Sequence, residues 1–594
     1  MSSESIGPAE AAANKRPPEL RNDPIWRDAA YLGGLLGRYF KSDPWVATAL
    51  TLILFFASLL AAVLIVQLNV QTGAMTDALV ALNAAKVQRI LISLLVILSA
   101  VLVVGQTLLA ATYFLRWRLR AKYTLEFVTQ WLSQNRFLAL QRDRRIENPE
   151  QRIQEDFFFI AESVIELAPS VVGSIATVVL SLGLIWQASH PLSLAPIGIP
   201  ITVPADMLVA TLVFATLWTI GAHFIGRPIT QIEVSRQRLE ADFRHGLGQV
   251  REYSEAIAFE RGAERERQRA LGLFGLIGVN WRRYTIAQVK LNAFNELVNM
   301  LIPKLVPVLL SIPHILAGQM TVGQMAAATL AFNMVLSGFG FFARLYASIA
   351  ALRAGVARIR FFDTELKRPI TSDITLVEGG KQLALRGLRI DLPDGERLLE
   401  VDRLDVASGD RVLVRGRSGA GKSTLLRAIA GLWPYGAGAI ETPARDRILF
   451  LPQRSYMPSG ALAELLSYPR EPTPADRGRY VDALRRLSLD HFVDRLDEQA
   501  HWRQILSPGE QQRMAAVRAL LRAPDFLFLD EATSALDVEL EADVYRALTE
   551  ELPGAAIVSV AHRPTVARFH TTAIDIANGR AAASILIPAQ SSDP

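Results

Sequence analysis

The nine residues from Gly416 to Thr424 carry the clearest chemical pattern in the chain. They are Gly416, Arg417, Ser418, Gly419, Ala420, Gly421, Lys422, Ser423 and Thr424, which fit the spacing G-x-x-x-x-G-K-[ST]. Glycines at these positions let backbone N–H groups turn towards a phosphate, and the start of a following helix adds partial positive charge. Lys422 is expected to hold the β- and γ-phosphates, and Ser423 to ligate Mg2+.

The flanking residues supply the strand and the helix that such a loop requires. Residues 411–415 form a short run that includes the β-branched residues Val412 and Val414, as in a buried strand. Residues 425–432 are apolar at helical spacing. A glycine turn that fits the pattern by chance is the alternative, but the strand and helix around it favour a phosphate-binding loop. All nine residues of the loop are therefore candidate nucleotide contacts.

A second apolar strand ends in two carboxylates. Residues 526–529 are all Phe or Leu, and Asp530 and Glu531 follow directly. A hydrolase of this kind needs one acid to hold Mg2+ and a second acid to polarise the attacking water. We assign Asp530 to the metal and Glu531 to the water.

Further segments stand in the order found in ATP-binding cassette (ABC) ATPases. Residues 506–513 resemble the signature loop, residues 534–537 the D-loop, Gln453 the Q-loop glutamine and His562 the switch histidine. A lone histidine after a strand is more often structural, but five motifs in sequence favour a functional one. The resemblance implies ATP and Mg2+ as cofactors, with Gln453 near the metal and both Gln453 and His562 serving catalysis beside Glu531.

The signature loop also implies a partner. In the family, Ser507 and the Gly509 backbone bind the γ-phosphate that the glycine loop of another subunit holds, and we place Glu510 and Asp537 at the same composite site. This chain contains one cassette with every motif intact. The simplest assembly is therefore a homodimer with two equivalent ATP sites.

Length and composition indicate a membrane protein. The chain has 594 residues, of which 51% are hydrophobic and only 20% charged, and its formal net charge is +5. This length predicts at least two domains. Basic residues are interspersed with acidic ones, which argues against a nucleic-acid partner. The absence of cysteine excludes disulfides, thiolate metal sites and thiol nucleophiles.

Six apolar runs are long enough to cross a bilayer. They cover residues 45–66, 89–115, 164–186, 207–225, 294–317 and 322–343. Arginine is dense in the stretches after the second and fourth runs, and nearly absent from the other connections. The positive-inside rule therefore places these two stretches in the cytoplasm, on the same side as the ATPase.

Both cytoplasmic connections show helical periodicity, over residues 116–141 and 229–271. We expect them to continue the spans as stalks towards the cassettes. The segments 148–153 and 252–259 lie at the tips of these stalks, and they are either coupling segments or solvated helix turns. They resemble the N-P-x-Q-R-I and E-x-I-A-F segments of one ABC subfamily, which favours coupling.

Span five carries a polar stripe. Asn292, Asn295, Glu296 and Asn299 recur at helical spacing on one face. Polar groups at membrane depth are costly unless they face water or a partner, so the stripe is expected to line a translocation cavity. The alternative, that residues 292–299 meet water at the cytoplasmic interface, is equally open.

The predicted fold is an α-helical six-span domain of the exporter-type ABC fold, followed by an α/β P-loop ABC ATPase domain. Residues 1–24 are expected to be disordered and residues 25–365 to form the transmembrane domain, opening with an interfacial helix over residues 26–40. Residues 372–588 are expected to form the nucleotide-binding domain, and residues 589–594 a loose tail.

Finer features resemble the peroxisomal fatty-acyl half-transporters and, more closely, the bacterial SbmA/BacA-like proteins fused to an ATPase. These features are the two stalk tips, Pro508 and Glu510 in the signature loop, Trp502 before it and Gly-Leu-Trp-Pro at residues 431–434. The resemblance implies a bacterial inner-membrane importer of antimicrobial or cysteine-rich peptides, bleomycin or cobalamin. It also implies a lipid environment and no requirement for a substrate-binding protein.

Two other functions stay open. An exporter or flippase of lipidic or amphipathic compounds would share the fold and differ in direction. A soluble cassette protein acting on ribosomes or DNA is almost excluded by the six apolar runs. One departure leaves the adenine contact unassigned, because Leu392 and Pro393 stand where the family usually has an aromatic residue.

Overall fold

The computed structural model describes residues 24–143, 146, 148–193 and 202–585. The chain divides into two compact units, Met1–Lys367 and Arg368–Pro594. This division falls between the predicted domain limits at residues 365 and 372. The segments expected to be disordered or loose, residues 1–24 and 589–594, lie outside the described residues apart from Pro24.

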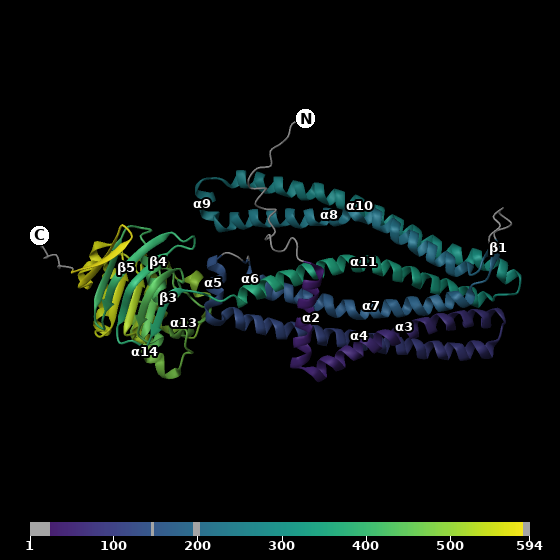
Figure 1. The fold of residues 1–594 in the computed structure, drawn as a ribbon, viewed down its shortest axis with the longest axis horizontal. Helices are drawn as coiled ribbons and strands as arrows, with labels where there is room; N and C mark the ends of the chain where they lie inside the picture. Colours follow the sequence, from purple (N-terminus) through teal and green to yellow (C-terminus); the bar gives the residue numbers. More distant parts are fainter. Residues whose placement is uncertain (1–23, 144–145, 147, 194–201, 586–594) are drawn as a thin grey trace, which may run out of the picture. The chain divides into compact units, whose positions relative to one another are not determined.

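The first unit is built from helices. In chain order they are α2 (Ile25–Ser42), α3 (Pro44–Val80), α4 (Ala84–Leu132), α5 (Arg136–Asp143), α6 (Pro149–Gln151), a π-helical turn η3 (Arg152–Asp156), α7 (Phe157–Ala188), α8 (Asp206–Glu252), α9 (Ser254–Phe259), α10 (Ala263–Leu316) and α11 (Val322–Lys367) (Figure 1). Two short strands, β1 (Leu192–Ser193) and β2 (Thr202–Val203), pair before α8.

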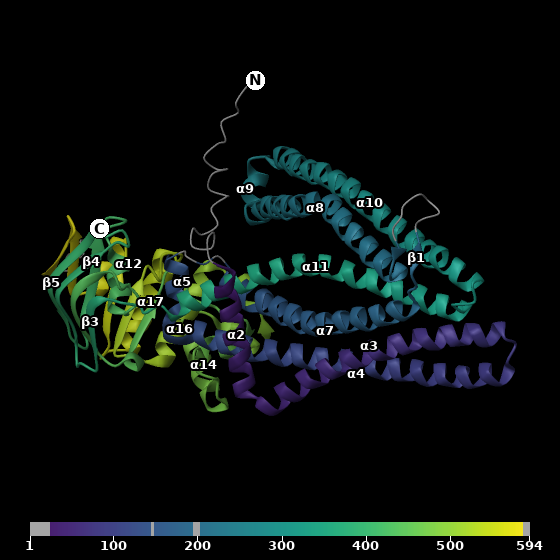
Figure 2. The same ribbon diagram turned by 45° about the vertical axis from the view of Figure 1, so that its right-hand side comes forward.

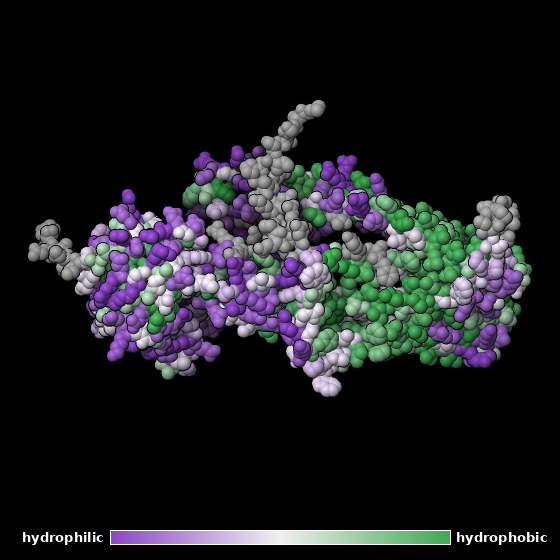
Figure 3. Space-filling view, viewed as in Figure 1, coloured by the Kyte–Doolittle hydropathy of each residue, from purple (hydrophilic) through white to green (hydrophobic). Residues whose placement is uncertain are grey.

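Six helical stretches among the described residues are long and apolar enough to cross a membrane, which confirms the six predicted spans. Their exposed hydrophobic side chains gather in a broad band on the surface of the first unit, with hydrophilic residues beyond it (Figure 3). Lipid offers backbone groups no hydrogen bonds, so a spanning segment must satisfy them internally, as a helix does. The spans therefore set the architecture of this unit.

A helix, α2, is present where the sequence predicts an interfacial helix before the first span. Its Asp28 is buried and accepts hydrogen bonds from Arg353 Nε at 3.1 Å and Arg360 Nε at 3.2 Å, both on α11. Ile25 and Trp26, in its first turn, are exposed. Charged contacts thus attach one face of α2 to α11.

Two glycines bring α3 and α11 into close contact. A Cβ on Gly73 would lie 2.5 Å from Gly323 O, and one on Gly323 would lie 2.1 Å from Gly73 O. The carboxylate of Asp77, on α3, accepts hydrogen bonds from the Gly323 N–H at 2.7 Å and the Thr321 hydroxyl at 2.8 Å. The end of α3 therefore supplies the acceptor that the first turn of α11 needs.

The stalks are helical as predicted, with one break that the sequence does not predict. The first is not continuous, because Gln134 and Asn135 have left-handed φ values of 52° and 56° and separate α4 from α5. The second reverses direction at α9, so its two legs are α8 and α10, which lie side by side (Figures 1 and 2). The predicted coupling segments lie at helix ends, since residues 149–153 form α6 and the start of η3 and residues 254–259 form α9.

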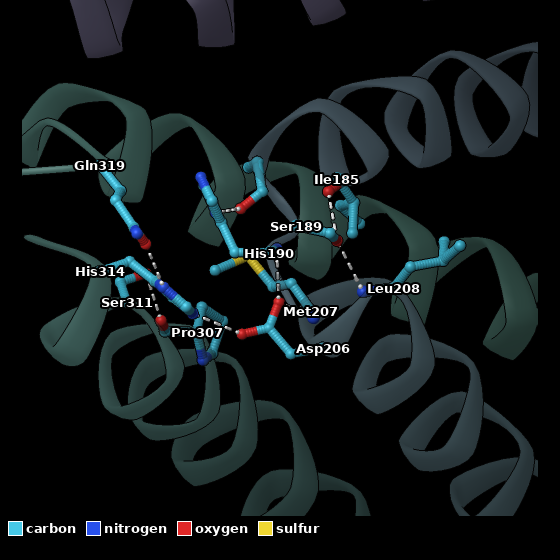
Figure 4. Close-up of polar contacts among 11 residues, drawn as sticks. Ile185, Ser189, His190, Asp206, Met207, Leu208, Pro307, Ser311, His314 and Gln319 are labelled. Atoms are coloured by element: carbon cyan, nitrogen blue, oxygen red, sulfur yellow. Dashed lines mark hydrogen bonds and ion pairs between the residues drawn. The ribbon is translucent and has the colours of Figure 1, made fainter. Parts of the chain in front are cut away.

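A buried polar network joins three segments at the ends of α7, α8 and α10 opposite to α9 (Figure 4). The carboxylate of Asp206 accepts hydrogen bonds from the backbone N–H of His190 at 3.0 Å and of Met207 at 2.7 Å, and lies 3.0 Å from Nε2 of His314. The His314 ring stacks on that of His190 with centroids 4.7 Å apart, and its Nδ1 lies 3.1 Å from Gln319 Oε1. Asp206 and His314 are 3% and 7% exposed, so the carboxylate and imidazole at the centre of this network are buried.

Replacing Asp206 by Ala should destabilise the membrane unit. The change leaves two backbone N–H groups without an acceptor and Nε2 of His314 without its partner, at a cost on the order of 1–3 kcal/mol for each buried group. We expect the purified full-length Asp206→Ala protein to unfold at a lower temperature than wild type, and Asp206→Asn, which keeps one acceptor oxygen, to lie between them. Asp242→Ala, an exposed position on the same helix, is the control, and equal midpoints for the two Ala variants would contradict a stabilising role.

The second unit contains a ten-stranded sheet in the order β3-β7-β4-β5-β14-β13-β6-β12-β11-β8. The strands are β3 (Asp373–Glu378), β4 (Leu383–Asp391), β5 (Arg397–Val406), β6 (Arg411–Gly416), β7 (Gly436–Thr442), β8 (Ile448–Leu451), β11 (Phe526–Asp530), β12 (Ala556–Val560), β13 (Thr572–Ala577) and β14 (Arg580–Ile585). Neighbouring strands from β13 to β8 are all parallel.

Helices cover the parallel strands and form two cores with them. The helices of this unit are α12 (Lys422–Ile429), α13 (Leu462–Ser467), α14 (Arg477–Arg486), α15 (Trp502–Ile505), α16 (Pro508–Arg522) and α17 (Val538–Glu551). Along β11, Leu527 and Leu529 belong to one hydrophobic core, and Phe526 and Phe528 to the other. A strand buried on both faces explains why this segment is continuously apolar rather than alternating.

Register aligns the carboxyl ends of four parallel strands. Asp530 of β11 is opposite Val560 of β12, which is opposite Val414 of β6, and Leu529 is opposite Leu451 of β8. Residues that follow these strands therefore meet at one edge of the sheet. This edge is where open α/β sheets place their binding sites.

Candidate functional site

The glycine loop leaves the end of β6 and begins α12. Gly416, Gly419 and Gly421 have φ values of +154°, +81° and +95°, which favour glycine. A Cβ on Gly416 would also lie only 2.8 Å from the carbonyl oxygen of Ile576 on β13. Residues 417–419 are exposed at the crest of the loop. The predicted strand, loop and helix are thus present, with α12 starting three residues earlier than expected, at Lys422.

Lys422 turns back over its own loop. Its ammonium donates to the carbonyl oxygens of Gly416 at 2.8 Å and Arg417 at 3.0 Å, and the residue is 6% exposed. An ammonium group has three donors, so one more remains for a ligand at the loop. The positive charge of Lys422 therefore lies at the base of the loop, where it can stabilise a bound phosphate.

Two oxygen-bearing side chains meet beside this loop. The hydroxyl of Ser423, in the first turn of α12, donates to Asp530 Oδ1 at 2.8 Å, at the end of β11. A hydroxyl and a carboxylate are the oxygen ligands that Mg2+ prefers. The structure therefore brings together the two residues that the sequence assigns to the metal.

Glu531 receives hydrogen bonds from two other predicted site residues. Gln453 Nε2 donates to Glu531 Oε2 at 3.1 Å, and His562 Nε2 lies 3.0 Å from Glu531 Oε1. An ionised carboxylate only accepts hydrogen bonds, so the geometry requires the proton of His562 on Nε2. The Glu531 backbone has a left-handed φ of 50°, and its N–H donates to Val560 O of β12 at 3.0 Å. Gln453 and His562 follow β8 and β12, so three strand ends position this carboxylate.

These residues fit a magnesium nucleotide. The glycine loop and Lys422 offer donors and positive charge to phosphates, and Ser423 and Asp530 offer oxygens to the cation. Gln453 gives its amide N–H to Glu531, which leaves its carbonyl oxygen for the metal side of the site. When bound, Mg2+ neutralises charge that develops on the phosphates. Glu531 lies beside these residues. Hydrogen bonds from Gln453 and His562 hold its carboxylate, which can orient a water.

The signature residues form the start of α16. Ser507 caps the helix, and its N–H and hydroxyl both donate to Glu510 Oε2 at 2.8 Å, while the Glu510 N–H donates to Ser507 Oγ at 3.3 Å. Pro508 has no N–H. This reciprocal capping box therefore leaves the Gly509 N–H as the donor of the first turn that it does not use.

Glu510 also faces a histidine outside the motif. His491 Nε2 lies 3.1 Å from Glu510 Oε1. Burial acts to raise the pKa of the Glu510 carboxyl, but the hydrogen bonds from Ser507 and His491 outweigh it and the pKa is lowered. Glu510 is thus an anion at the start of α16. Asp537 has a similar local role, because its carboxylate accepts the Leu540 N–H at 2.8 Å and caps α17.

The structure also shows functional contacts that sequence reasoning missed. Gln512 on α16 bonds the D-loop residues Ser534 and Ala535, and Arg563, next to the switch histidine, donates to Leu536 O at 2.6 Å. Both residues adjoin recognised motifs. No spacing rule distinguishes them from surface side chains, so the sequence held no signal for these contacts.

One predicted stripe is divided by the structure. On α10, Asn292, Glu296 and Asn299 are exposed in the protomer, whereas Asn295 accepts a hydrogen bond from Trp218 Nε1 of α8 at 3.0 Å. Asn295 therefore belongs to the contact between two helices. The other three residues stay candidates for a cavity lining.

Two parts of the chain match known protein families. Residues 35–316 match the ABC transporter transmembrane region 2, and residues 399–534 match the ABC transporter family. An uncharacterised ABC transporter ATP-binding protein of Haemophilus influenzae is 33% identical over 484 residues, which cover 80% of each chain. The inner membrane ABC transporter ATP-binding protein YddA of Escherichia coli is 28% identical, over 78% of this chain and 82% of its own. ABC transporter D family member 2, chloroplastic, of Arabidopsis thaliana is also 28% identical, over 78% and 74%.

Six spans and one nucleotide-binding unit in a single chain define a half-transporter with fused transmembrane and ATPase domains. The chain belongs to the ABC transporter family, and it is related to the ABC transporter D family. It binds ATP with Mg2+ and hydrolyses ATP in a reaction coupled to transport. The expected location, the inner membrane with a cytoplasmic ATPase unit, agrees with the name of the Escherichia coli relative. The narrower SbmA/BacA-like assignment stays a prediction.

Replacing Glu531 by Gln should separate nucleotide binding from hydrolysis. The amide keeps the shape of the side chain but cannot polarise water as a carboxylate does, a contribution of about 100-fold or more. We expect Glu531→Gln to bind ATP with near wild-type affinity and to lose at least 99% of turnover, about the same factor. Lys422→Ala is the comparison and should lose ATP binding itself. Wild-type hydrolysis by Glu531→Gln would show that another group activates the water.

Proposed function

We propose that two copies of this chain form a homodimer with two composite ATP sites. In each site, Lys422 and the glycine loop hold the phosphates, Ser423, Asp530 and Gln453 hold Mg2+, and Glu531 activates water with His562 beside it. The second copy contributes Ser507, Gly509, Glu510 and Asp537. The chain carries one glycine loop and one signature segment. In the family, a signature segment contacts a nucleotide held by another subunit's glycine loop, so one chain cannot complete a site and two copies can.

Exposed apolar side chains on the stalk legs support the dimer. Outside the predicted spans, the described parts of α8 and α10 carry nine large hydrophobic residues that are between 46% and 65% exposed: Val234, Leu247, Leu271, Phe274, Leu276, Val279, Trp281, Ile286 and Val289. Lipid does not cover these positions if the legs extend into the cytoplasm. Apolar surface that neither lipid nor the rest of the protomer covers is typical of a protein interface. A second copy of the chain is the occupant that we propose.

The dimer can be tested by mass. We expect the full-length Glu531→Gln protein with Mg-ATP in lipid nanodiscs to have the protein mass of two chains, because ATP would join the two copies without being consumed. Val234→Asp combined with Trp281→Asp should weaken the association. Gln237→Asp combined with Gln268→Asp, at exposed polar sites on the same two legs, is the matched control for the added charge. A single-chain mass for the Glu531→Gln protein with bound Mg-ATP, without the two Asp substitutions, would refute the homodimer.

We infer that the transported solute is bulky and hydrophilic, such as antimicrobial or cysteine-rich peptides, bleomycin-like or cobalamin-like compounds, and that it is imported by alternating access. The observation behind this inference is the polar surface of α10. Asn292, Glu296, Asn299 and Lys304 are all exposed in the protomer on this span. Charged groups facing lipid would be costly, so a water-filled cavity explains them better. Such a cavity suits a hydrophilic solute more than a lipidic one.

Uptake into cells tests both the solute and the direction. We expect cells that produce the wild-type protein to accumulate labelled bleomycin or a cysteine-rich peptide faster than cells that produce Lys422→Ala, because only the former hydrolyses ATP. Asn299→Leu should reduce uptake while ATPase activity persists, and the adjacent exposed Met300→Leu should not. ATP-dependent loss of the label from the cells would instead support the exporter or flippase.

A further inference from the structure

Gln512 is a buried amide between two motifs that the proposed dimer presents to the other copy. It lies in the first half of α16, the helix that begins with the signature residues, and it is 8% exposed. Its Oε1 accepts the Ala535 N–H at 2.8 Å, and its Nε2 donates to Ser534 Oγ at 3.2 Å. Ser534 and Ala535 are themselves exposed. The amide oxygen and the amide nitrogen of Gln512 thus both bond the exposed D-loop.

Chemistry fixes the orientation of this amide. The Ala535 N–H can only donate, so the atom of Gln512 that faces it must be the oxygen. The nitrogen must then face Ser534, whose hydroxyl can accept. Glu at this position would keep the first bond, and an apolar residue would keep neither.

Packing also connects the signature segment to the D-loop. A Cβ added to Gly509 would lie 3.3 Å from Leu536 Cδ2 and 3.5 Å from Ala535 O, so the signature backbone contacts the D-loop directly. On its other side, the D-loop is held by Arg563, which donates to Leu536 O at 2.6 Å and to Ser534 O at 3.4 Å. Arg563 is the residue after His562, which contacts Glu531.

These contacts form a continuous path. It runs from Glu531 to His562 and Arg563, then through the carbonyl groups of the D-loop, and from the Ala535 N–H through Gln512 into α16. Buried Glu541 supports the path, since it accepts the Thr533 hydroxyl at 2.8 Å and pairs with Arg563 at 3.5 Å. Networks of this kind couple sites when their members hold one another in a fixed geometry.

We propose that Gln512 is a positioning residue for ATP hydrolysis: it joins the D-loop to the signature helix, so that Ser507, Gly509 and Asp537 meet the nucleotide of the other copy as one rigid surface. The proposal rests on the composite ATP site proposed above. Gln512 itself touches no nucleotide. Its loss should therefore leave nucleotide binding to the glycine loop intact and impair closure of the composite site.

The test uses full-length protein in lipid nanodiscs and the variant Gln512→Met, which keeps the length of the side chain without either hydrogen bond. We expect kcat for ATP hydrolysis to fall roughly 30-fold, the effect of two lost hydrogen bonds. KM for ATP and the thermal midpoint should stay within the range of Gln504→Met, an exposed control on α15. In a Glu531→Gln background, radiolabelled ATP should stay trapped after rapid gel filtration, and Gln512→Met should release it.

Two further variants separate positioning from simple destabilisation. Ser534→Ala removes one of the two bonds and should give a smaller loss of kcat, and adding it to Gln512→Met should cost nothing further, because the two residues act as a pair. Gln512→Glu, which keeps the acceptor for Ala535, should retain more activity than Gln512→Met. Full kcat in Gln512→Met, or a loss matched by an equal loss of ATP binding, would overturn the proposal. If Glu531→Gln alone traps no ATP, the composite site itself fails.

Discussion

The parallel arrangement of four strands is the constraint on which the ATPase site depends. Because β6, β8, β11 and β12 run in the same direction and in register, their carboxyl ends deliver the glycine loop, Gln453, the pair Asp530 and Glu531, and His562 to one edge of the sheet. These residues span more than a hundred positions in sequence. Hydrophobic cores on both faces hold the strands in place, so apolar packing at a distance from the site determines distances within it.

The membrane unit depends on a different constraint, the lack of hydrogen-bond partners in lipid. Helices satisfy their own backbone, but their ends still need partners. The structure supplies them with side chains from other helices, as Asp77 of α3 does at the start of α11 and Asp206 does between α7, α8 and α10. Among the residues that the structure describes in this unit, buried carboxylates occur where helices begin, end or meet.

The sequence predicts the periodic and motif-bearing parts of this protein well. Six apolar runs, the strand before Gly416 and the acidic pair after residue 529 all occur where hydropathy and spacing indicate. Contacts between distant side chains follow no such pattern: Asp206 and His314 are 108 residues apart, and Gln512 and Ala535 are 23 apart. The sequence also does not predict the helix break at Gln134, because non-glycine residues seldom adopt a positive φ and nothing in the local residue types indicates one. Roles at the nucleotide, which depend on a second copy, lie beyond what one chain displays.

Helix α10 has a mechanical consequence. Its 54 residues include prolines only at 303, 307 and 313, so the stretch from Ala263 to Ile302 keeps an unbroken hydrogen-bond ladder. Such a segment is about 60 Å long at 1.5 Å per residue, and a tilt of ~5° at one end displaces the other by about 5 Å. Bending is easiest where proline removes a backbone donor, in the last third of the helix. The proline-free part then acts as a lever arm, with its pivot near the cluster of prolines.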